Sequence, residues 1–251
     1  MSGLAPEAPS VSLIIPAYNE VRTLAGTIDE AHAYFDARGL PHEIIAAVEG
    51  DDGTVELAHA LAAGRDYLRV SANSGRRGKG FAIRRAVPMT TGAIVGFADA
   101  DNKTPIDQFD RVRAAFEDGA DLVIGSRAMA PASSGRSRRW YRRVGTRAFA
   151  VCVHGVVGLR GVPDTQCGFK FFRSEVARDV FSRQVIDGYM FDVEILCLAC
   201  DAGYRLTQVP VRWRDDRDSR LHLVRGNLRN VADIGRIQWN RLARVWRARE
   251  A

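Results

Sequence analysis

The 251-residue sequence predicts a single α/β domain of Rossmann-like type, with a mostly parallel central sheet flanked by helices and an amphipathic helix at the C-terminus. Short apolar runs alternate with longer stretches whose apolar residues have helical spacing. Most of the runs are rich in β-branched residues, as in strands buried on both faces. Polar turns follow several runs, as expected at the carboxyl edge of a parallel sheet, where ligands bind.

In the first half, the apolar runs predict strands at residues 11–15, 43–48, 67–71, 93–98 and 120–126. The stretches between them are long enough for helices that connect parallel strands by right-handed crossovers. In the second half, strands at 168–174 and 204–213 flank a predicted helix at 191–203. We expect a disordered N-terminus at 1–10, one domain at 11–224 and a basic amphipathic helix at 225–251.

Composition excludes a disordered chain, because 46% of the residues are hydrophobic and 26% are charged. The net charge of +6 indicates an anionic partner, which could be a nucleic acid, a membrane surface or a phosphorylated substrate. Of the 36 basic residues only three are lysines, and the other 33 are arginines. The lysines are Lys79, Lys103 and Lys170, and all three lie in segments with other unusual features.

The cysteines do not predict a zinc site, because the pair Cys197 and Cys200 has no second pair and no nearby histidine. The longest apolar run, at 148–159, is 12 residues long and too short to cross a bilayer. No leader segment is evident at the start of the sequence. We therefore expect a cytoplasmic protein, with peripheral contact at the inner face of a membrane as an additional option.

Asp99 and Asp101 directly follow the run at 93–98. Two carboxylates so close repel each other and are costly to desolvate unless a cation or hydrogen-bond donors compensate them. At a strand end, one carboxylate could meet a ribose hydroxyl while the other binds Mg²⁺ or Mn²⁺, and that ion could bridge a diphosphate. The alternative is an acidic turn that binds no ligand.

Two further turns could contact a nucleotide. Pro16, Tyr18 and Glu20 follow the first strand and could cradle a base and ribose, although Asn19 could instead be the N-cap of a helix. The glycine-rich turn at 73–80 precedes a helix, so its backbone N–H groups and Lys79 could face phosphates. This turn matches neither a P-loop nor a dinucleotide-binding fingerprint.

Seven motifs occur in a fixed order across residues 11 to 213: VSLIIPAYNE, the Gly-Lys-Gly turn, GFADAD, DLVIGSR, DTQCGFKFF, FDVEIL and VPVRW. Together they resemble the family-2 inverting glycosyltransferases, which have a GT-A fold. The pairing of DTQCGFK with FDVEIL is similar to the dolichyl- and polyprenyl-phosphate glucosyl- and mannosyltransferases. The resemblance implies transfer of a hexose from a nucleotide-diphosphate sugar, of UDP-glucose or GDP-mannose type, to a polyprenyl phosphate.

The resemblance also implies roles for individual residues. Pro16, Tyr18 and Glu20 would line the nucleotide. Asp99 would contact the ribose or the metal, and Asp101 would bind the metal. Arg127 would lie near phosphate.

Acceptor-side roles are implied for a basic segment at 136–147, which holds six arginines. Arg142 and Thr146 match the spacing with which relatives hold the acceptor phosphate, and Arg139 belongs to the same cluster. A phosphate acceptor needs no strong base. Asp192 becomes the candidate base if the acceptor is a hydroxyl.

The sequence departs from the family pattern in two places. In the segment 48–54, either Glu49 or Asp51 substitutes for the aspartate that reads the base in the family, or the donor base is read differently. Lys103 stands two residues after Asp101, where the mannosyltransferases offer a neutral metal ligand. A lysine there would repel a metal or stand in for it, so the sequence leaves metal dependence open.

Residues 226–249 have an amphipathic pattern that suits an interfacial helix or a helix packed on the domain. One face carries Leu228, Val231, Ile234, Trp239, Leu242, Val245 and Trp246. Three alternatives to an enzyme that acts on a lipid phosphate stay open at this point. They are a soluble small-molecule or peptide acceptor, a nucleic-acid-binding module, and an inactive protein that binds nucleotide sugars.

Overall fold

The computed structural model describes residues 10–73, 75–129, 155, 157–159, 161–214 and 225–243, with the backbone alone described at 225–229. The segment before Ser10 lies outside the described residues, and so do Arg139, Arg142 and Thr146. The expectations for these parts of the chain remain predictions.

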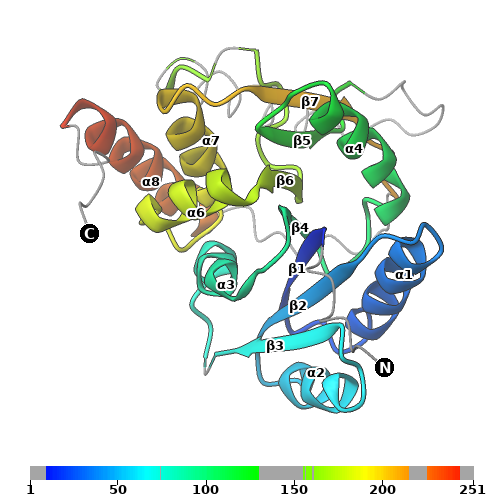
Figure 1. Ribbon diagram of the computed structural model, residues 1–251. Coiled ribbons are helices and arrows are strands. Elements are labelled where there is room, and N and C mark those ends of the chain that lie inside the picture. Colours follow the sequence, from blue (N-terminus) through cyan, green and yellow to red (C-terminus); the bar gives the residue numbers. More distant parts are fainter. Residues whose placement is uncertain are drawn as a thin grey trace.

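Within the described residues, one seven-stranded sheet has the order β3-β2-β1-β4-β6-β5-β7. Figure 1 shows it crossing the molecule from β3 at one edge to β7 at the other. Its strands are β1 Val11–Tyr18, β2 His42–Glu49, β3 Leu68–Ala72, β4 Ile94–Ala98, β5 Leu122–Ser126, β6 Phe169–Arg173 and β7 Leu206–Pro210.

All strand pairs in the sheet are parallel except those of β6, which is antiparallel to both β4 and β5. The predicted mostly parallel α/β sheet is confirmed. Strand β6 lies between β4 and β5, which run in the same direction, and it runs opposite to both. The last strand is shorter than expected and ends at Pro210, although the N–H of Val211 still donates to the carbonyl of Ser126 in β5 at 3.3 Å.

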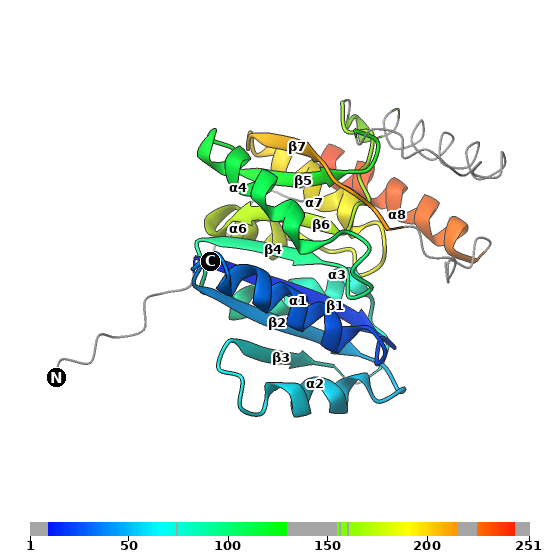
Figure 2. The same cartoon turned by 90° about the vertical axis from the view of Figure 1, so that its right-hand side faces the viewer.

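Helices cover both faces of the sheet (Figure 2). They are α1 Leu24–Asp36, α2 Thr54–Ala62, α3 Lys79–Ala86, α4 Phe109–Glu117, α6 Ser174–Arg183, α7 Phe191–Asp201 and α8 Arg225–Leu242, with short 3₁₀ turns η1 Val87–Met89 and η2 Ile106–Gln108. One apolar core lies under α1, α2 and α4, and a second lies under α3, α6, α7 and part of α8. The helix α7 is buried along nearly its whole length, which explains why FDVEILCLAC lacks a polar face.

The C-terminal helix α8 divides its apolar residues between two sides. Ile234 and Ile237 are buried in the second core. Val231, Trp239 and Leu242 are 61%, 70% and 72% exposed. The single apolar face expected from the sequence is therefore split into a packed side and an exposed side. No helix in the described part of the chain is long and apolar enough to cross a membrane.

Candidate functional site

Polar turns gather at the carboxyl edge of the sheet. Tyr18 and Glu49 end β1 and β2 and are partners in the strand register. Asp99 follows β4, the neighbour of β1 on the other side. Lys79 is the first residue of α3, which begins at the same edge. Because parallel strands end together, the tertiary structure brings four of the predicted site residues to one edge.

The carboxylate of Glu49 holds the glycine-rich turn. Its Oε2 accepts the backbone N–H groups of Arg77 at 2.9 Å and Gly78 at 3.2 Å. Gly78 has a φ of 120°, and a Cβ there would lie 2.5 Å from the carbonyl oxygen of Asp187. Only glycine fits this position. Glu49 is 3% exposed and is engaged within the protein.

Asp51, the alternative residue for reading the base, is exposed just beyond β2. Its Oδ1 accepts the side-chain amide of Asn19 at 3.0 Å, and its N–H donates to Oδ1 of Asn19 at 3.0 Å. Asn19 has a positive φ of 55° and joins the ends of β1 and β2. The N-cap of α1 is Thr23, so the alternative role for Asn19 is not observed.

The predicted nucleotide-lining residues follow the end of β1. Pro16 and Glu20 are half-buried, and Tyr18 is 39% exposed. The Arg76 guanidinium lies 4.6 Å from the centre of the Tyr18 ring. Oε2 of Glu20 accepts the hydroxyl of Thr23 at 2.9 Å. An exposed ring flanked by a guanidinium is a surface on which a planar group can stack.

Lys79 and Asp99 form an ion pair, with Nζ 2.5 Å from Oδ1. Burial lowers the pKa of Lys79, but Asp99 and Asp192 raise it by more, so the net pKa lies above its ordinary value. Lys79 is therefore a permanent cation at neutral pH. Gly168 lies against Asp99 from the other side, because a Cβ there would be 1.9 Å from Oδ2.

Asp101 is held by Lys103, the residue whose charge left metal dependence open in the sequence. Nζ of Lys103 lies 2.8 Å from Oδ2 of Asp101, and the backbone N–H of Lys103 donates to Oδ1 at 3.3 Å. Asn102 between them has a φ of 49°, and its amide donates to Glu30 of α1 at 2.6 Å. The turn is thus closed on itself and tied to α1.

Asp192, the candidate base, is in the first turn of α7 and 3% exposed. Its Oδ1 lies 2.5 Å from Nζ of Lys170, which is completely buried and also donates to the carbonyl of Cys167 at 2.6 Å. A buried carboxylate that is bonded to a lysine is not within reach of an external hydroxyl, as a general base must be. The third lysine thus also binds an aspartate near the site.

Arg127 and Asp164 form a two-pronged ion pair at the end of β5. Nε and Nη2 of Arg127 donate to the two carboxylate oxygens at 2.8 and 2.7 Å, and the Arg127 N–H donates at 2.8 Å. Burial raises the pKa of Asp164, but the bonds and charge of Arg127 lower it by more. The net pKa lies below its ordinary value, so the carboxylate is ionised. The Arg127 guanidinium lies 5.8 Å from the Trp213 ring centre. Asp164 begins the motif DTQCGFK, but no role for it was predicted from the sequence.

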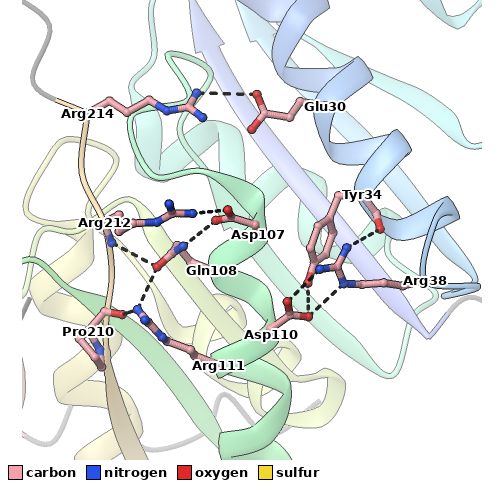
Figure 3. Close-up of polar contacts among 10 residues, drawn as sticks. All are labelled: Glu30, Tyr34, Arg38, Asp107, Gln108, Asp110, Arg111, Pro210, Arg212 and Arg214. Atoms are coloured by element: carbon pink, nitrogen blue, oxygen red, sulfur yellow. Dashed lines mark hydrogen bonds and ion pairs between the residues drawn. The ribbon is translucent and has the colours of Figure 1, made fainter.

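The segment after β7 is tied to η2 and to α1 by its arginines (Figure 3). Arg212 pairs with Asp107, and its N–H donates to Gln108 of η2 at 3.2 Å. Arg214 lies 3.8 Å from Glu30, and its N–H donates to the carbonyl of Lys103 at 2.8 Å. No role was predicted for Arg212 or Arg214 from the sequence. The sequence indicates them only by the arginines at 212 and 214, which follow the last apolar residues of the strand.

The buried acid Glu194 supports the glycine-rich turn indirectly, through the segment at 185–186. Glu194 of α7 accepts the N–H groups of Val185 and Ile186, the latter at 2.8 Å. Burial raises the pKa of Glu194 to about 7, and the two N–H groups offset part of that rise. The segment it holds contacts the turn, since a Cβ on Gly80 would be 2.6 Å from the carbonyl oxygen of Ile186.

The D-x-D carboxylates do not fit a divalent ion in this arrangement. Asp99 and Asp101 each bind a lysine ammonium, and a second cation on the same oxygens would be repelled. The described residues contain no group of three His, Cys, Asp or Glu side chains that could hold a metal. The predicted binding of Mg²⁺ or Mn²⁺ therefore remains a prediction that the side-chain geometry does not favour.

Comparison with known proteins identifies the family to which the chain belongs. Residues 12–181 match the family model described as glycosyl transferase family 2. The dolichyl-phosphate beta-glucosyltransferase of Drosophila melanogaster is 32% identical over 257 residues, which cover 96% of this chain and 78% of the relative.

Solved structures share the fold. Mannosyl-3-phosphoglycerate synthase from Rubrobacter xylanophilus matches with a TM-score of 0.68 at 21% identity, covering 97% of this chain and 77% of that one. Glucosyl-3-phosphoglycerate synthase from Mycobacterium tuberculosis, in complex with Mn²⁺, UDP and phosphoglyceric acid, matches with a TM-score of 0.64 at 21% identity, covering 93% and 78%. The matched span and the fold show that this chain belongs to glycosyltransferase family 2 and is a glycosyltransferase with the GT-A fold.

Proposed function

We propose that this glycosyltransferase transfers a hexose, with inversion, from a nucleotide-diphosphate sugar to the phosphate of a polyprenyl carrier. The observation that carries the proposal is the Lys170–Asp192 pair, because it leaves the predicted base buried and neutralised. An acceptor hydroxyl would need a base, whereas a phosphate oxygen is already anionic. The name of the Drosophila relative, a dolichyl-phosphate beta-glucosyltransferase, agrees with a phosphate acceptor.

The proposed reaction is a single displacement. An acceptor phosphate oxygen attacks the anomeric carbon, and the bond to the diphosphate breaks with its electron pair leaving on the nucleoside diphosphate. In the described site, a lysine or an arginine pairs with each of the four carboxylates of Asp99, Asp101, Asp164 and Asp192, so none of these four is offered as a free nucleophile for double displacement. Positioning of the two reactants and stabilisation of the leaving group then supply the catalysis.

On the donor side, Tyr18 is proposed to stack on the base, and Asp51 is proposed to read it. Glu49 was the other candidate, but its carboxylate is buried and bonded to the glycine-rich turn. Asp51 is exposed at the same edge, with Asn19 holding one of its oxygens. Lys79 and Arg127 are proposed to lie on the diphosphate side. UDP in the related solved structure supports a uridine donor, with a guanosine donor as the alternative.

On the acceptor side, the basic segment at 136–147 is proposed to hold the carrier phosphate, with Arg142 and Thr146 in contact and Arg139 adding charge. The exposed side of α8 supports an acceptor in a membrane. Val231, Trp239 and Leu242 project from it, a combination that suits insertion among lipid headgroups. We propose peripheral contact with the membrane that carries the acceptor.

The proposal is tested by incubating the protein with UDP-glucose or GDP-mannose and a short-chain polyprenyl phosphate, with the matching polyprenol as control. We expect a glycosyl phosphate product from the phosphate only, with anomeric configuration opposite to that of the donor by NMR. Glycosylation of the polyprenol at an equal rate would contradict the phosphate acceptor. A retained configuration would contradict single displacement.

A further inference from the structure

All three lysines of this arginine-rich chain pair with aspartates in or beside the site. Lys79 pairs with Asp99, Lys103 with Asp101 and Lys170 with Asp192, at 2.5, 2.8 and 2.5 Å. The other 33 basic residues are arginines, so use of lysine coincides with this one neighbourhood. Lysine offers a compact ammonium in place of a planar fork, and a compact charge fits between closely spaced oxygens.

We infer that the ammonium groups of Lys79 and Lys103 take the place of a divalent ion at Asp99 and Asp101, so that this chain binds the diphosphate of its donor without a metal. The inference deepens the proposed function and rests on it, since it concerns the same donor. It separates this chain from the structurally similar synthase that was solved with both Mn²⁺ and UDP.

Charge supports the inference. Two carboxylates and two ammonium groups make the D-x-D neutral, as a divalent ion on two carboxylates would. A divalent ion added to this arrangement would bring two further positive charges beside two ammonium groups, in a partly desolvated site. Binding of the ion would require at least one lysine to leave its carboxylate.

Lys103 is held in a position from which its ammonium can take the place of a metal ion. Its side chain is 19% exposed, less than is usual for a surface lysine. Its backbone is fixed on both sides, by its own N–H bond to Asp101 and by the N–H of Arg214 on its carbonyl. Asn102 before it is bonded to Glu30 of α1. The turn that carries Lys103 is thus anchored to α1 and to the segment after β7. This anchoring keeps the Lys103 ammonium at the Asp101 carboxylate before any ligand binds.

Lys79 is held equally firmly. It begins α3 directly after Gly78, whose N–H is bonded to Glu49. Its side chain is 19% exposed, and its ammonium lies 5.4 Å from the centre of the Phe97 ring. The apolar wall strengthens its attraction to Asp99. Both cations are therefore part of the folded protein and do not depend on the solution for supply, as a metal ion does.

The test uses the full chain treated with EDTA. Calorimetry measures the binding of UDP and GDP, and of UDP-glucose and GDP-mannose, in EDTA and in Mn²⁺. For the wild type we expect one of these nucleotides to bind with a dissociation constant that changes less than about threefold between the two conditions. Lys103→Gln, which offers a neutral oxygen, should bind that nucleotide about tenfold or more weakly in EDTA, since a charge-assisted contact is lost.

A second readout follows the metal itself. Electron paramagnetic resonance of free Mn²⁺ should show stoichiometric uptake by Lys103→Gln with nucleotide, and weaker uptake by the wild type. Lys103→Arg keeps the charge and should bind nucleotide in EDTA better than Lys103→Gln. The matched control is Arg113→Gln, which removes a cation from the exposed Arg113–Glu117 pair of α4 and should behave as wild type.

The outcomes separate the two proposals. Nucleotide binding by the wild type only when Mn²⁺ is present would overturn the metal-free inference and leave the proposed function standing. Absence of nucleotide binding in both conditions would overturn the proposed function, and the inference with it. Equal binding by Lys103→Gln and wild type in EDTA would overturn the role of Lys103.

Discussion

Lys170 and Asp192 form a salt bridge inside the protein, with Nζ 2.5 Å from Oδ1 and with side chains that are 0% and 4% exposed. It joins β6 in the middle of the sheet to the first turn of α7. Such a pair contributes little net stability compared with apolar residues, but loss of one partner leaves a buried charge. The pair therefore fixes where α7 begins relative to the sheet, and the charge of Asp192 also raises the pKa of Lys79, the lysine proposed to lie on the donor side.

Removal of one partner should be strongly destabilising. Lys170→Met should lower the free energy of unfolding in urea by about 3–5 kcal/mol, because Asp192 would remain buried without a cation. The control Arg113→Gln, in a pair 51% and 70% exposed, should change it by less than about 1 kcal/mol. The double variant Lys170→Met/Asp192→Leu should recover much of the loss. Equal effects of the buried and exposed changes would contradict the argument.

Asp101→Ala should abolish sugar transfer while leaving the fold intact. The carboxylate holds the Lys103 ammonium at 2.8 Å, and loss of a preorganised charge in such a site lowers the rate by about 100-fold or more. Transfer is followed with a radiolabelled donor, and the melting temperature reports the fold. Asp118→Ala, at an exposed position after α4, is the control. Near wild-type turnover of Asp101→Ala would remove the D-x-D from the mechanism.

Arg142→Ala should impair the acceptor side alone. The six arginines at 136–147 repel one another unless they are solvated or bind anions, and a carrier phosphate would relieve that repulsion. We expect a higher acceptor KM or a lower kcat, with donor affinity by calorimetry unchanged. Equal damage to donor affinity would place this residue on the nucleotide side.

The pKa of Glu194 predicts how stability changes with pH. Burial raises this pKa from 4.5 to about 7, so between these values the folded protein binds more protons than the unfolded chain. The stabilisation is complete below the unfolded pKa and is lost as pH rises through the folded pKa. Between pH 5 and 8 the wild type should lose up to about 3 kcal/mol relative to Glu194→Gln, which cannot ionise.

Urea unfolding of both proteins at several pH values measures this difference. Glutamine keeps an acceptor for the N–H groups of Val185 and Ile186, so the comparison isolates the charge. A constant difference between the two proteins across the whole pH range would show that Glu194 titrates normally.

Trp239→Ser should weaken binding to membranes without changing stability. Trp239 is 70% exposed on α8, so little packing is lost in the protein. Transfer of an aromatic side chain from water to an apolar environment is worth about 1.5–3 kcal/mol, which is about tenfold or more in affinity. Co-sedimentation with vesicles rich in anionic lipid measures the change, and neutral vesicles are the control. Unchanged sedimentation would show that α8 does not contact lipid.

The sequence by itself determined the class of fold, and it pointed to the carboxyl edge of the sheet as the candidate site. Apolar runs such as 43–48 and 93–98 became strands because burial on both sheet faces requires continuous apolar residues, a property that is local to each run. Asp99 and Asp101 were recognisable because two carboxylates after such a run have few structural explanations. The turn at 73–80 was likewise evident from its glycines, and the structure shows why Gly78 is needed.

Only the tertiary structure decided which charges meet. Lys79 and Asp99 are 20 residues apart, and Lys170 and Asp192 are 22 apart, so no local pattern predicts either pair. Glu49 had the right type and place for reading a base, but packing of the glycine-rich turn engaged it. On α8, the contact of Ile234 and Ile237 with the core split a stripe that appeared continuous in the sequence. Periodicity reports which residues avoid water, whereas the neighbour that shields each of them depends on how distant elements pack.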